Sequence, residues 1–215
     1  MSDSPAGTAE PAEPADPGGY GQAVASDGTM TGPDGRPRCP WALSAPEYPE
    51  YIAYHDGEWG RPVRDRVGLF ERLSLEAFQS GLSWLTVLRK RDAFRAAFAN
   101  FDPIAVAAFG PADVERLAAD AGIIRNRRKI IATITNARVV LALDVPFEEV
   151  IWSFRPAVTT VPVVTADLPA STAESAALAT ELKTRGFVFV GPTTAYALMQ
   201  ACGLVNDHLA ACAVR

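Results

Sequence analysis

The chain has 215 residues, of which 48% are hydrophobic, 21% are charged and 9% are aromatic. This length and composition fit one globular domain, with or without an additional tail. No run of about 18 apolar residues occurs, which argues against a membrane partner, and the start of the sequence lacks the basic and apolar regions of a secretory signal. Three cysteines are too few for a disulfide scaffold, so we expect a cytoplasmic protein with reduced thiols.

The acidic charge of the chain is concentrated in residues 1–37. This segment contains six acidic residues and one basic residue, whereas residues 38–215 contain 19 of each, so the net charge of −5 belongs to the first segment. Residues 1–37 also hold 7 of the 16 glycines and 6 of the 17 prolines. Such a composition buries too little apolar surface to offset the entropy of ordering. We therefore predict a disordered tail at 1–37 and a folded domain at 38–215.

Hydrophobic residues recur at helical spacing through most of the predicted domain. Aromatic residues show this spacing at 51–59, and apolar residues continue it over 67–90. Gly81 and Ser83 interrupt the second stretch, which we expect to form two helices. The pattern predicts an all-α domain of seven to nine helices.

Start and stop signals position the later helices. Asp102 stands before a proline, as an N-cap stands before the first helical position. Ser171 and Glu174 have the spacing of a capping box and open a helix that should end at Gly186. Residues 158–164 are rich in β-branched side chains but include a proline, so we expect a loop or a very short strand. Further helices are predicted at residues 111–121, 127–143 and 192–202.

Histidines and cysteines are few enough to be considered together. Cys39 precedes His55 by 16 residues, and His208 lies four residues before Cys212, so the second pair would share one face of a helix. Two thiols and two imidazoles would form a closed, structural zinc site that joins the two ends of the domain. The alternative is that the cysteines are small apolar core residues, which is our interpretation of Cys202.

Residues 187–195 connect two predicted helices through a Gly-Pro turn. Gly191 would let the backbone approach a ligand closely, and the amide groups that open the next helix, at Thr193 and Thr194, can face an anion. A helix-hairpin-helix of this kind can hold a DNA phosphate without reading bases. An ordinary tight turn between two helices is the alternative.

Several long segments, in the same order and without gaps, resemble one known family. They are Cys39–Trp41, Tyr51–Gly60, Leu75–Trp84, Ala121–Ile130 and Phe187–Cys212. The family is 3-methyladenine DNA glycosylase I, a zinc-containing member of the helix-hairpin-helix superfamily. The resemblance extends from about residue 38 to the C-terminus and leaves out the tail.

The resemblance implies a fold and a set of site residues. It implies a helix-hairpin-helix glycosylase fold in which one structural zinc ion per chain joins the N-terminal and C-terminal segments. It also places Tyr54 and Trp84 in the pocket for the damaged base and Glu76 at the position that recognises this base. The zinc ligands that it implies are Cys39, His55, His208 and Cys212.

The segment after the hairpin lacks a group that would drive base expulsion. Many helix-hairpin-helix glycosylases carry an aspartate in a Val-Asp-Thr-His-like segment, and the matching stretch here is 205–208. The uncharged Asn206 occupies the aspartate position and cannot stabilise an oxocarbenium ion by charge, while Asp207 is shifted by one residue. No lysine lies within 187–195, so strand cleavage by a lyase mechanism is not expected.

A substrate that methylation has already activated resolves this difficulty. Adenine methylated at N3 is positively charged in DNA and leaves as a neutral base, so the enzyme needs mainly to flip and position the nucleotide. Aromatic rings can stack on such a base and attract its charge. The candidates, for each of which core packing is the alternative, are Trp41, Tyr51, Tyr54, Trp59 and Trp84.

Glu76 is the candidate acid for recognition and catalysis. Its carboxylate can accept hydrogen bonds from the N6 amino edge of adenine, whereas guanine presents a carbonyl oxygen there. Taken without the resemblance, a solvated surface glutamate is the alternative. Whether Glu76 also acts as the general base for the attacking water stays open at this point, as does activity on 3-methylguanine.

Two basic clusters supply local positive charge. Residues 89–91 with Arg95 form one cluster, for which a solvated surface is the alternative. The second cluster follows the turn at Gly122, and we predict that it contacts DNA phosphates. Its members are Arg125, Arg127, Arg128 and Lys129.

These observations together predict a monofunctional hydrolase. The enzyme would act as a monomer on double-stranded alkylated DNA, cleave the N-glycosidic bond of a flipped 3-methyladenine and leave an abasic site. Two other classes share the same motifs: a zinc-stabilised protein that binds damaged DNA without catalysis, and a zinc hydrolase that acts on a small substrate.

Overall fold

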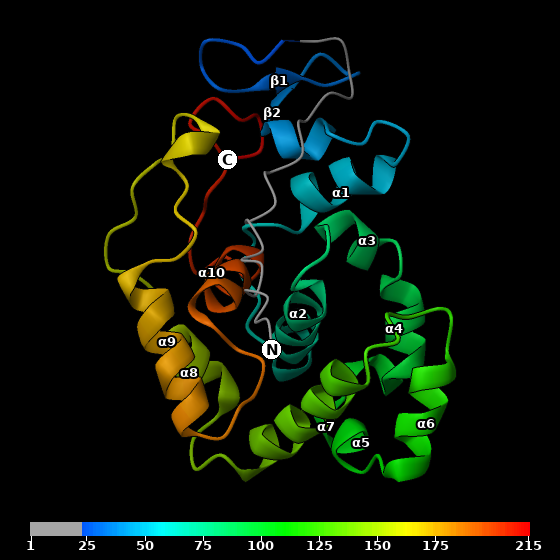
Figure 1. The fold of residues 1–215 in the computed structure, drawn as a ribbon. Helices are drawn as coiled ribbons and strands as arrows, with labels where there is room; N and C mark the ends of the chain where they lie inside the picture. The colour runs from blue at the N-terminus through cyan, green and yellow to red at the C-terminus, as the bar shows by residue number, and fades with distance from the viewer. Residues whose placement is uncertain (1–22) are drawn as a thin grey trace, which may run out of the picture.

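The structure is a computed structural model and describes residues 23–215 (Figure 1). The α-helices within this range are α1 (Pro49–Gly57), α2 (Arg66–Gln79), α3 (Trp84–Leu88), α4 (Arg91–Ala97), α5 (Pro103–Ala107), α6 (Pro111–Ala119), α7 (Arg127–Ala142), α8 (Phe147–Trp152), α9 (Ala173–Thr184) and α10 (Pro192–Ala201). The shorter elements are the strands β1 (Met30–Thr31) and β2 (Pro37–Arg38) and the 3-10 helices η1 (Pro40–Leu43), η2 (Ala99–Phe101) and η3 (Thr165–Asp167).

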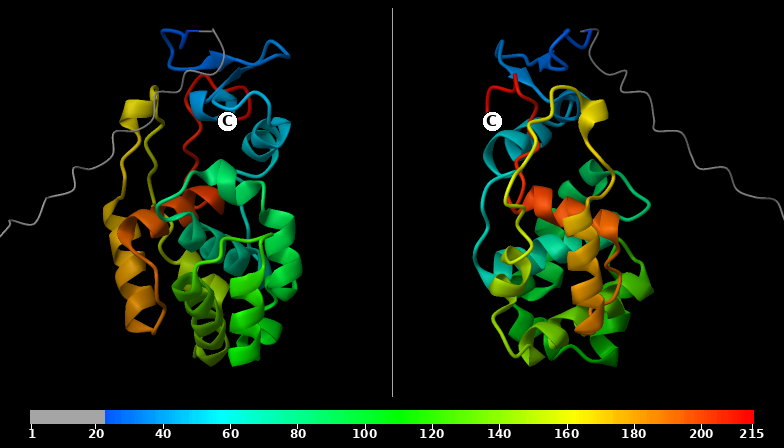
Figure 2. Two further views of the ribbon diagram at one scale, coloured as in Figure 1. Left: turned by 45° about the vertical axis from the view of Figure 1, so that its right-hand side comes forward. Right: turned by 90° about the vertical axis from the view of Figure 1, so that its left-hand side faces the viewer.

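α2 is the central helix of the fold. Nine of its 14 residues are buried, and Phe70, Leu73 and Phe78 have no solvent exposure. The helix contacts α7, α8 and α10. Figures 1 and 2 show α4 to α6 on one side of it and α9 and α10 on the other. The C-terminal half of α2 is therefore held between two groups of helices.

Most predicted helices are confirmed close to their predicted bounds. The break between α2 and α3 lies at Gly81, whose φ of +83° is in the left-handed region that favours glycine. Asp102 caps α5 by accepting a hydrogen bond from the Ile104 amide at 3.0 Å. Local sequence signals determine these boundaries because the groups that form them are only a few residues apart.

Three details of the predicted helices differ. The structure has ten α-helices within residues 23–215, more than the seven to nine predicted, because α4 and α8 are too short to show a clear period. The capping box of α9 uses Thr172 and Ser175, one residue later than the predicted Ser171 and Glu174. Residues 158–164 form a loop without a strand, one of the two forms predicted.

Residues 23–37 correct the predicted extent of the disordered tail. β1 and β2 pair as antiparallel strands, and Met30 is buried. The Ala213 amide donates to the carbonyl of Pro37 at 2.9 Å, so the far end of the chain holds this hairpin. Composition could not reveal it, because the stabilising partner is distant in sequence. Residues 1–22 of the predicted tail lie outside the described residues.

The chain after α10 corrects a second prediction. Residues 203–215 form successive turns instead of a helix, so the helical spacing expected for His208 and Cys212 is wrong. The segment nevertheless runs back past α1 toward the β1–β2 hairpin, as Figure 1 shows. The two ends of the domain are therefore neighbours, as the predicted zinc site requires.

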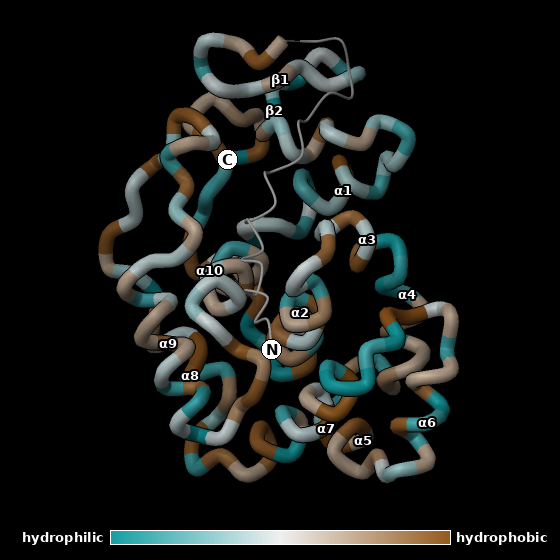
Figure 3. Tube along the Cα trace, in the orientation of Figure 1, coloured by the Kyte–Doolittle hydropathy of each residue, from teal (hydrophilic) through white to brown (hydrophobic). Residues whose placement is uncertain are grey.

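Hydropathy along the chain agrees with this architecture. None of the helices within residues 23–215 combines the length and the apolar character needed to cross a membrane. Hydrophobic and hydrophilic positions alternate along the helices in Figure 3, and the residues that open α7 are strongly hydrophilic. The core is therefore built from one face of each surrounding helix, with α2 in the middle.

Candidate active site and metal cluster

A cavity of about 210 Å³ lies at the C-terminal end of α2. Its walls come from η1, α1, α2, α3 and α10, with one residue from the turn after α1 and one from the loop after η3. All five predicted aromatic residues and Glu76 line it. The complete lining is Trp41, Tyr51, Tyr54, Trp59, Glu76, Gln79, Trp84, Leu168, Ala197 and Gln200.

The aromatic residues form one continuous cluster around the cavity. The ring centres of Trp41 lie 5.1 Å from those of both Tyr51 and Trp59, and Tyr54 lies 5.1 Å from Trp84. These rings pack on one another and also border the cavity, so the core-packing alternative and the binding interpretation both describe them. Walls of this kind suit a flat, polarisable ligand.

Glu76 is the only acidic residue among the described lining residues of the cavity. Its exposed fraction is 6%, so the alternative of a solvated surface glutamate is excluded. Burial raises the pKa of its carboxyl group to about 8, an effect that the nearby Arg72 guanidinium partly opposes. No side chain within residues 23–215 forms a hydrogen bond with this carboxyl group. Glu76 therefore offers a carboxyl group to a ligand without a competing partner.

Burial also fixes the protonation of the two tyrosines. It raises the pKa of Tyr51 to about 12, and it raises the pKa of Tyr54 well above the usual range, with an added contribution from the charge of Glu76. Both hydroxyl groups are therefore neutral near pH 7 and can donate or accept hydrogen bonds.

Four lining residues were not predicted from the sequence. Gln79 follows Glu76 by one helical turn, so its position on the same face could have indicated it. Ala197 and Gln200 come from α10, and Leu168 comes from the loop after η3. No local signal relates these three to the cavity, because only tertiary packing brings α10 and this loop to α2.

The predicted metal ligands lie directly behind the aromatic cluster. The donor atoms of Cys39, His55 and Cys212 all lie within 4.8 Å of one another, and all three side chains are buried. A hydrogen bond from Cys39 holds the pKa of the Cys212 thiol well below its usual range, and the neighbouring His55 ring acts in the same direction. The group thus has the soft and borderline donors that zinc prefers.

His208 is next to this group, but each of its two ring nitrogens faces an oxygen atom instead of the thiols. Its ring centre lies 4.7 Å from that of His55, and its Nε2 lies 3.2 Å from the His55 carbonyl oxygen. Its Nδ1 lies 2.8 Å from Oδ1 of Asn206. Burial lowers the pKa of His208, so the ring is neutral and has one N–H for two acceptor oxygens. A metal bound at Nε2 would remove this conflict.

Asn206 thus has a position that the sequence did not reveal. It orients a candidate metal ligand instead of facing the cavity. Asp207, the acidic residue shifted by one position, is buried and accepts hydrogen bonds from Tyr196 and Gln200.

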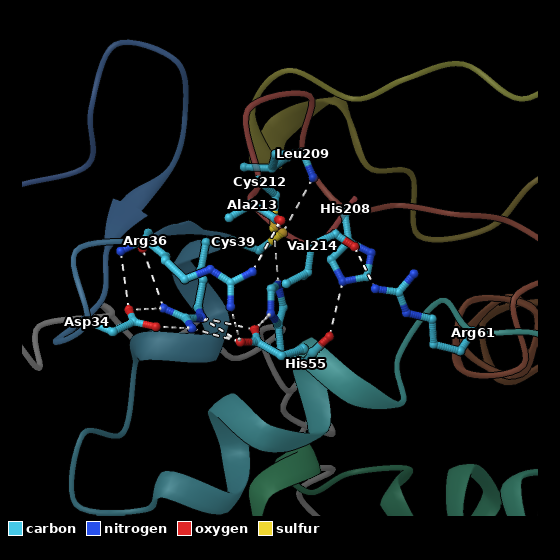
Figure 4. A network of polar contacts seen from close by, with 12 residues as sticks. Asp34, Arg36, Cys39, His55, Arg61, His208, Leu209, Cys212, Ala213 and Val214 are labelled. Carbon is cyan, nitrogen blue, oxygen red and sulfur yellow. Dashed lines mark hydrogen bonds and ion pairs between the residues drawn. The ribbon is translucent and has the colours of Figure 1, made fainter.

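A chain of charged groups holds the other histidine. Asp56 Oδ1 lies 2.8 Å from His55 Nδ1, and Arg38 donates to Asp56 at 2.7 and 2.9 Å. Figure 4 shows the polar network around His55. Arg38 is 3% exposed and also donates to Asp34 of the β1–β2 hairpin at 2.6 and 2.7 Å. A carboxylate on Nδ1 leaves Nε2 of His55 facing Cys212, which is the usual support of a metal-bound histidine.

The predicted DNA-binding cluster divides into different environments. Arg125 and Arg128 are exposed, and neither forms an ion pair with any residue in 23–215. Arg127 is exposed as well, but it forms two hydrogen bonds with Glu115, at 2.6 and 2.8 Å. The positive charge available to a phosphate is therefore concentrated at Arg125 and Arg128.

Lys129 corrects one DNA-binding prediction. Its side chain is buried, and Nζ donates to the carbonyls of Phe78 and Ser80 at 2.9 and 2.6 Å. These carbonyls lie at the C-terminal end of α2, where a cation satisfies acceptors that the helix leaves unpaired. Lys129 therefore caps α2 beside the cavity and is not available to DNA.

The other basic cluster is engaged within the protein in the same way. Arg91 pairs with Glu58 at 2.7 Å, and Arg95 pairs with Glu71 at 2.8 Å. Lys90 donates to the carbonyl of Ala121 at 3.0 Å. We therefore assign no DNA contact to this cluster.

The hairpin between α9 and α10 lies near the exposed basic residues. Asn136 of α7 donates to the Val188 carbonyl at 3.0 Å and accepts from its amide at 2.9 Å, which fixes the turn. The guanidinium carbon of Arg128 lies 5.7 Å from the centre of the Phe189 ring. Gly191 is the N-cap of α10, and the side chain of Thr193 is exposed and that of Thr194 is half-buried.

Comparisons with known proteins agree with this arrangement. Residues 41–215 match the family described as methyladenine glycosylase. The DNA-3-methyladenine glycosylase 1 of Escherichia coli strain K12 is 52% identical over 181 residues, which cover 81% of this chain and 95% of that protein. The chain belongs to the methyladenine glycosylase family. The DNA-3-methyladenine glycosylase of Haemophilus influenzae is 46% identical over 181 residues, covering 81% and 96%.

Solved structures of this family share the fold. A crystal structure of 3-methyladenine DNA glycosylase I matches with a TM-score of 0.78 and 50% identity, covering 82% of this chain and 98% of that one. The enzyme from Staphylococcus aureus, whose structure was described for its recognition of 3-methyladenine, matches with a TM-score of 0.74 and 32% identity, covering 81% and 95%. The family resemblance inferred from the sequence is confirmed.

The buried carboxyl group of Glu76 predicts a distinctive dependence of stability on pH. Its pKa is about 8 in the folded protein and 4.5 in an ordinary environment, so its ionisation destabilises the fold. The free energy of unfolding of a Glu76→Gln variant, taken relative to that of the wild type, should increase between pH 4.5 and 8 by about 5 kcal/mol. Urea unfolding of both proteins at several pH values measures this difference.

The comparison of the two proteins isolates Glu76, because all other titrating groups are shared. The difference in the free energy of unfolding should be constant below pH 4 and above pH 9. A difference that does not change across the whole range would contradict the raised pKa.

Proposed function

We propose that this protein, acting as a cytoplasmic monomer, removes 3-methyladenine from double-stranded alkylated DNA by hydrolysis of the N-glycosidic bond. Water adds to C1′ of the deoxyribose, the methylated base leaves as the neutral purine, and an abasic site remains. The observation that carries this proposal is the aromatic cavity with one buried carboxyl group in a chain of the methyladenine glycosylase family.

The cavity is suited to a cationic purine that has been flipped out of the helix. Stacking on the exposed ring faces of the cavity wall, to which Tyr54 and Trp84 contribute, would replace the stacking lost from DNA, and ring faces attract a positive charge. Bond cleavage then needs little assistance, because the methylated purine is a good leaving group. This agrees with Asn206, which carries no charge and faces His208 instead of the cavity.

Glu76 would distinguish a charged base from a neutral one. The empty cavity favours the protonated carboxyl group near pH 7, because burial disfavours its charge. A cationic base supplies the missing counter-charge, so its entry would release the proton of Glu76 and form a buried charge pair. A neutral lesion supplies no such charge and leaves the carboxyl group protonated. Glu76 therefore acts mainly as a reader of the base in this proposal.

The hairpin would hold the DNA backbone as in a helix-hairpin-helix. Backbone amides at the start of α10, following Gly191, face outward where a phosphate can bind. Arg128, in the first turn of α7, lies beside the hairpin at Phe189, and Arg125 is exposed in the segment just before α7. These groups contact phosphates rather than base edges, so they position the duplex without reading its sequence.

Zinc would be a structural ion in this protein. Cys39, His55 and Cys212 would hold it, with His208 as the fourth ligand. The ion would link the segment before α1 to the end of the chain. It would stabilise the fold and would not take part in the reaction. Because Trp41 packs on His55 and Trp59 packs on His208, at 5.0 and 4.7 Å, the ion would also stabilise one wall of the cavity.

Excision by Glu76 variants tests the proposed activity. The wild-type protein should release free 3-methyladenine from methylated DNA, and Glu76→Gln should lower kcat/KM by about 100-fold, because the neutral amide loses the charge pair with the base. Chromatography of the released bases measures both rates. Release of uracil or hypoxanthine at a comparable rate would contradict selection by charge.

The pH profile supplies a control for this variant. The wild-type kcat/KM should rise with pH and level off above about 8, as the free enzyme loses the proton of Glu76. The profile of Glu76→Gln, corrected for spontaneous depurination, should be flat over the same range. A flat profile for the wild type would show that ionisation of Glu76 is not needed.

Two neighbouring arginines test the DNA-binding surface. Arg128→Ala should weaken binding to DNA, because one phosphate contact is lost. The slope of the logarithm of the binding constant against the logarithm of salt concentration should become less steep by about one. Arg127→Ala is the matched control and should change binding little, because Glu115 already pairs with Arg127. Fluorescence anisotropy at several salt concentrations makes this comparison. Equal losses in both variants would contradict the assignment.

Metal content tests the zinc proposal independently of activity. The purified protein should contain one zinc ion per chain, and Cys39→Ser should lose the metal and melt at a lower temperature, because two chain ends are no longer joined. Cys202→Ala is the control for loss of a thiol, since Cys202 is buried away from the cluster, and it should retain zinc. Elemental analysis and thermal melting give the two readouts. Full stability of a zinc-free wild-type protein would refute the proposal.

A further inference from the structure

Gln200 is the one lining residue of the cavity whose side-chain amide is held by a buried carboxylate. Its Nε2 donates to Oδ2 of Asp207 at 2.8 Å, and the hydroxyl of Tyr196 donates to the same oxygen. Asp207 is 6% exposed and Tyr196 is also 6% exposed, so water competes little for these hydrogen bonds. The orientation of the Gln200 amide is therefore fixed by its surroundings.

The fixed orientation decides which atom Gln200 offers to a ligand. A carboxylate accepts hydrogen bonds and cannot donate them, so the amide nitrogen must face Asp207. Asp207 borders a separate cavity of about 570 Å³, and it does not line the aromatic cavity. Because Gln200 does line the aromatic cavity, its carbonyl oxygen is the polar atom that remains for a base there.

Gln79, at the C-terminal end of α2, provides a useful contrast. It also lines the cavity, but its side chain forms no hydrogen bond with any residue in 23–215. An amide without a partner can rotate to present either its N–H groups or its oxygen. Only the amide of Gln200 therefore imposes a fixed hydrogen-bonding requirement on the ligand.

We propose that Gln200, oriented by Asp207, is a second reader of the base and discriminates adenine from guanine. The exocyclic N6 amino group of 3-methyladenine has two N–H donors, so it can serve an acceptor at Gln200 in addition to Glu76. Guanine has a carbonyl oxygen at the corresponding position, which would face the Gln200 oxygen with no proton between them. An unpaired acceptor pair of this kind in a buried site is strongly disfavoured. Gln200 touches the substrate, and Asp207 is a positioning residue.

This inference rests on the proposed glycosylase function and is tested on the same methylated DNA. Gln200→Met keeps the length of the side chain and removes its polar atoms. It should lower kcat/KM for 3-methyladenine about tenfold, the effect of one lost hydrogen bond, while release of 3-methylguanine stays at the wild-type level or rises. Asp207→Ala should reduce the ratio of the two rates to a similar extent, because the Gln200 amide can then rotate.

Two control variants separate orientation from a general loosening of the site. Tyr196→Phe removes the other hydrogen bond to Asp207 and leaves that of Gln200, so the ratio should stay within about twofold of the wild type. Gln79→Met should lower both rates without changing their ratio. Zinc content and the melting temperature of each variant verify that His208, the neighbour of Asp207, keeps its place.

The outcomes distinguish this inference from the proposed function. If the wild type releases no 3-methyladenine, the glycosylase function fails. If the wild type releases it and Gln200→Met keeps the wild-type ratio, Gln200 does not read the base and only the present inference fails. An equal loss of ratio in Tyr196→Phe and Asp207→Ala would also overturn it, because the effect would then not depend on the bond to Gln200.

Discussion

The site depends on the burial of one carboxyl group. Glu76 lies on the most buried helix of the fold, and its position there raises its pKa to about 8. A carboxylate in such a place is unfavourable until a positive charge enters the cavity. The surrounding rings supply an apolar wall for that charge as well as a stacking surface. In the proposed function, selectivity for a methylated, cationic purine would follow from this desolvation, without an aspartate to drive the base out.

The rest of the fold keeps this cavity in shape. Lys129 caps the end of α2, next to the turn that leads to Trp84. On the other side, the rings of Trp41 and Trp59 pack against the two histidines of the metal cluster. A single zinc ion in that cluster would therefore stabilise both the junction of the chain ends and the aromatic wall, although it takes no part in the chemistry.

Charge is used in three separate ways in this chain. The partly buried ion pair of Arg38 with Asp56 orients His55, a proposed metal ligand, through hydrogen bonds. Other arginines are neutralised on the surface, as Arg127 is by Glu115. Arg125 and Arg128 have no such partner within residues 23–215, which is why we propose them for phosphate binding. The net charge of a domain therefore says little about its ability to bind DNA, since the distribution of pairs decides it.

The sequence by itself determined the helical class, most helix boundaries and the family. It also allowed Glu76 and the five aromatic residues that line the cavity to be predicted. These features depend on local periodicity, caps and motifs, which act over a few residues. Only the tertiary structure decided that Lys129 is a buried cap, that the β1–β2 hairpin is held by the C-terminal segment, and that Gln200 has a fixed amide. Each of these three features depends on a hydrogen bond to a particular partner group. Tertiary packing sets the position of that group, so the local sequence cannot predict it.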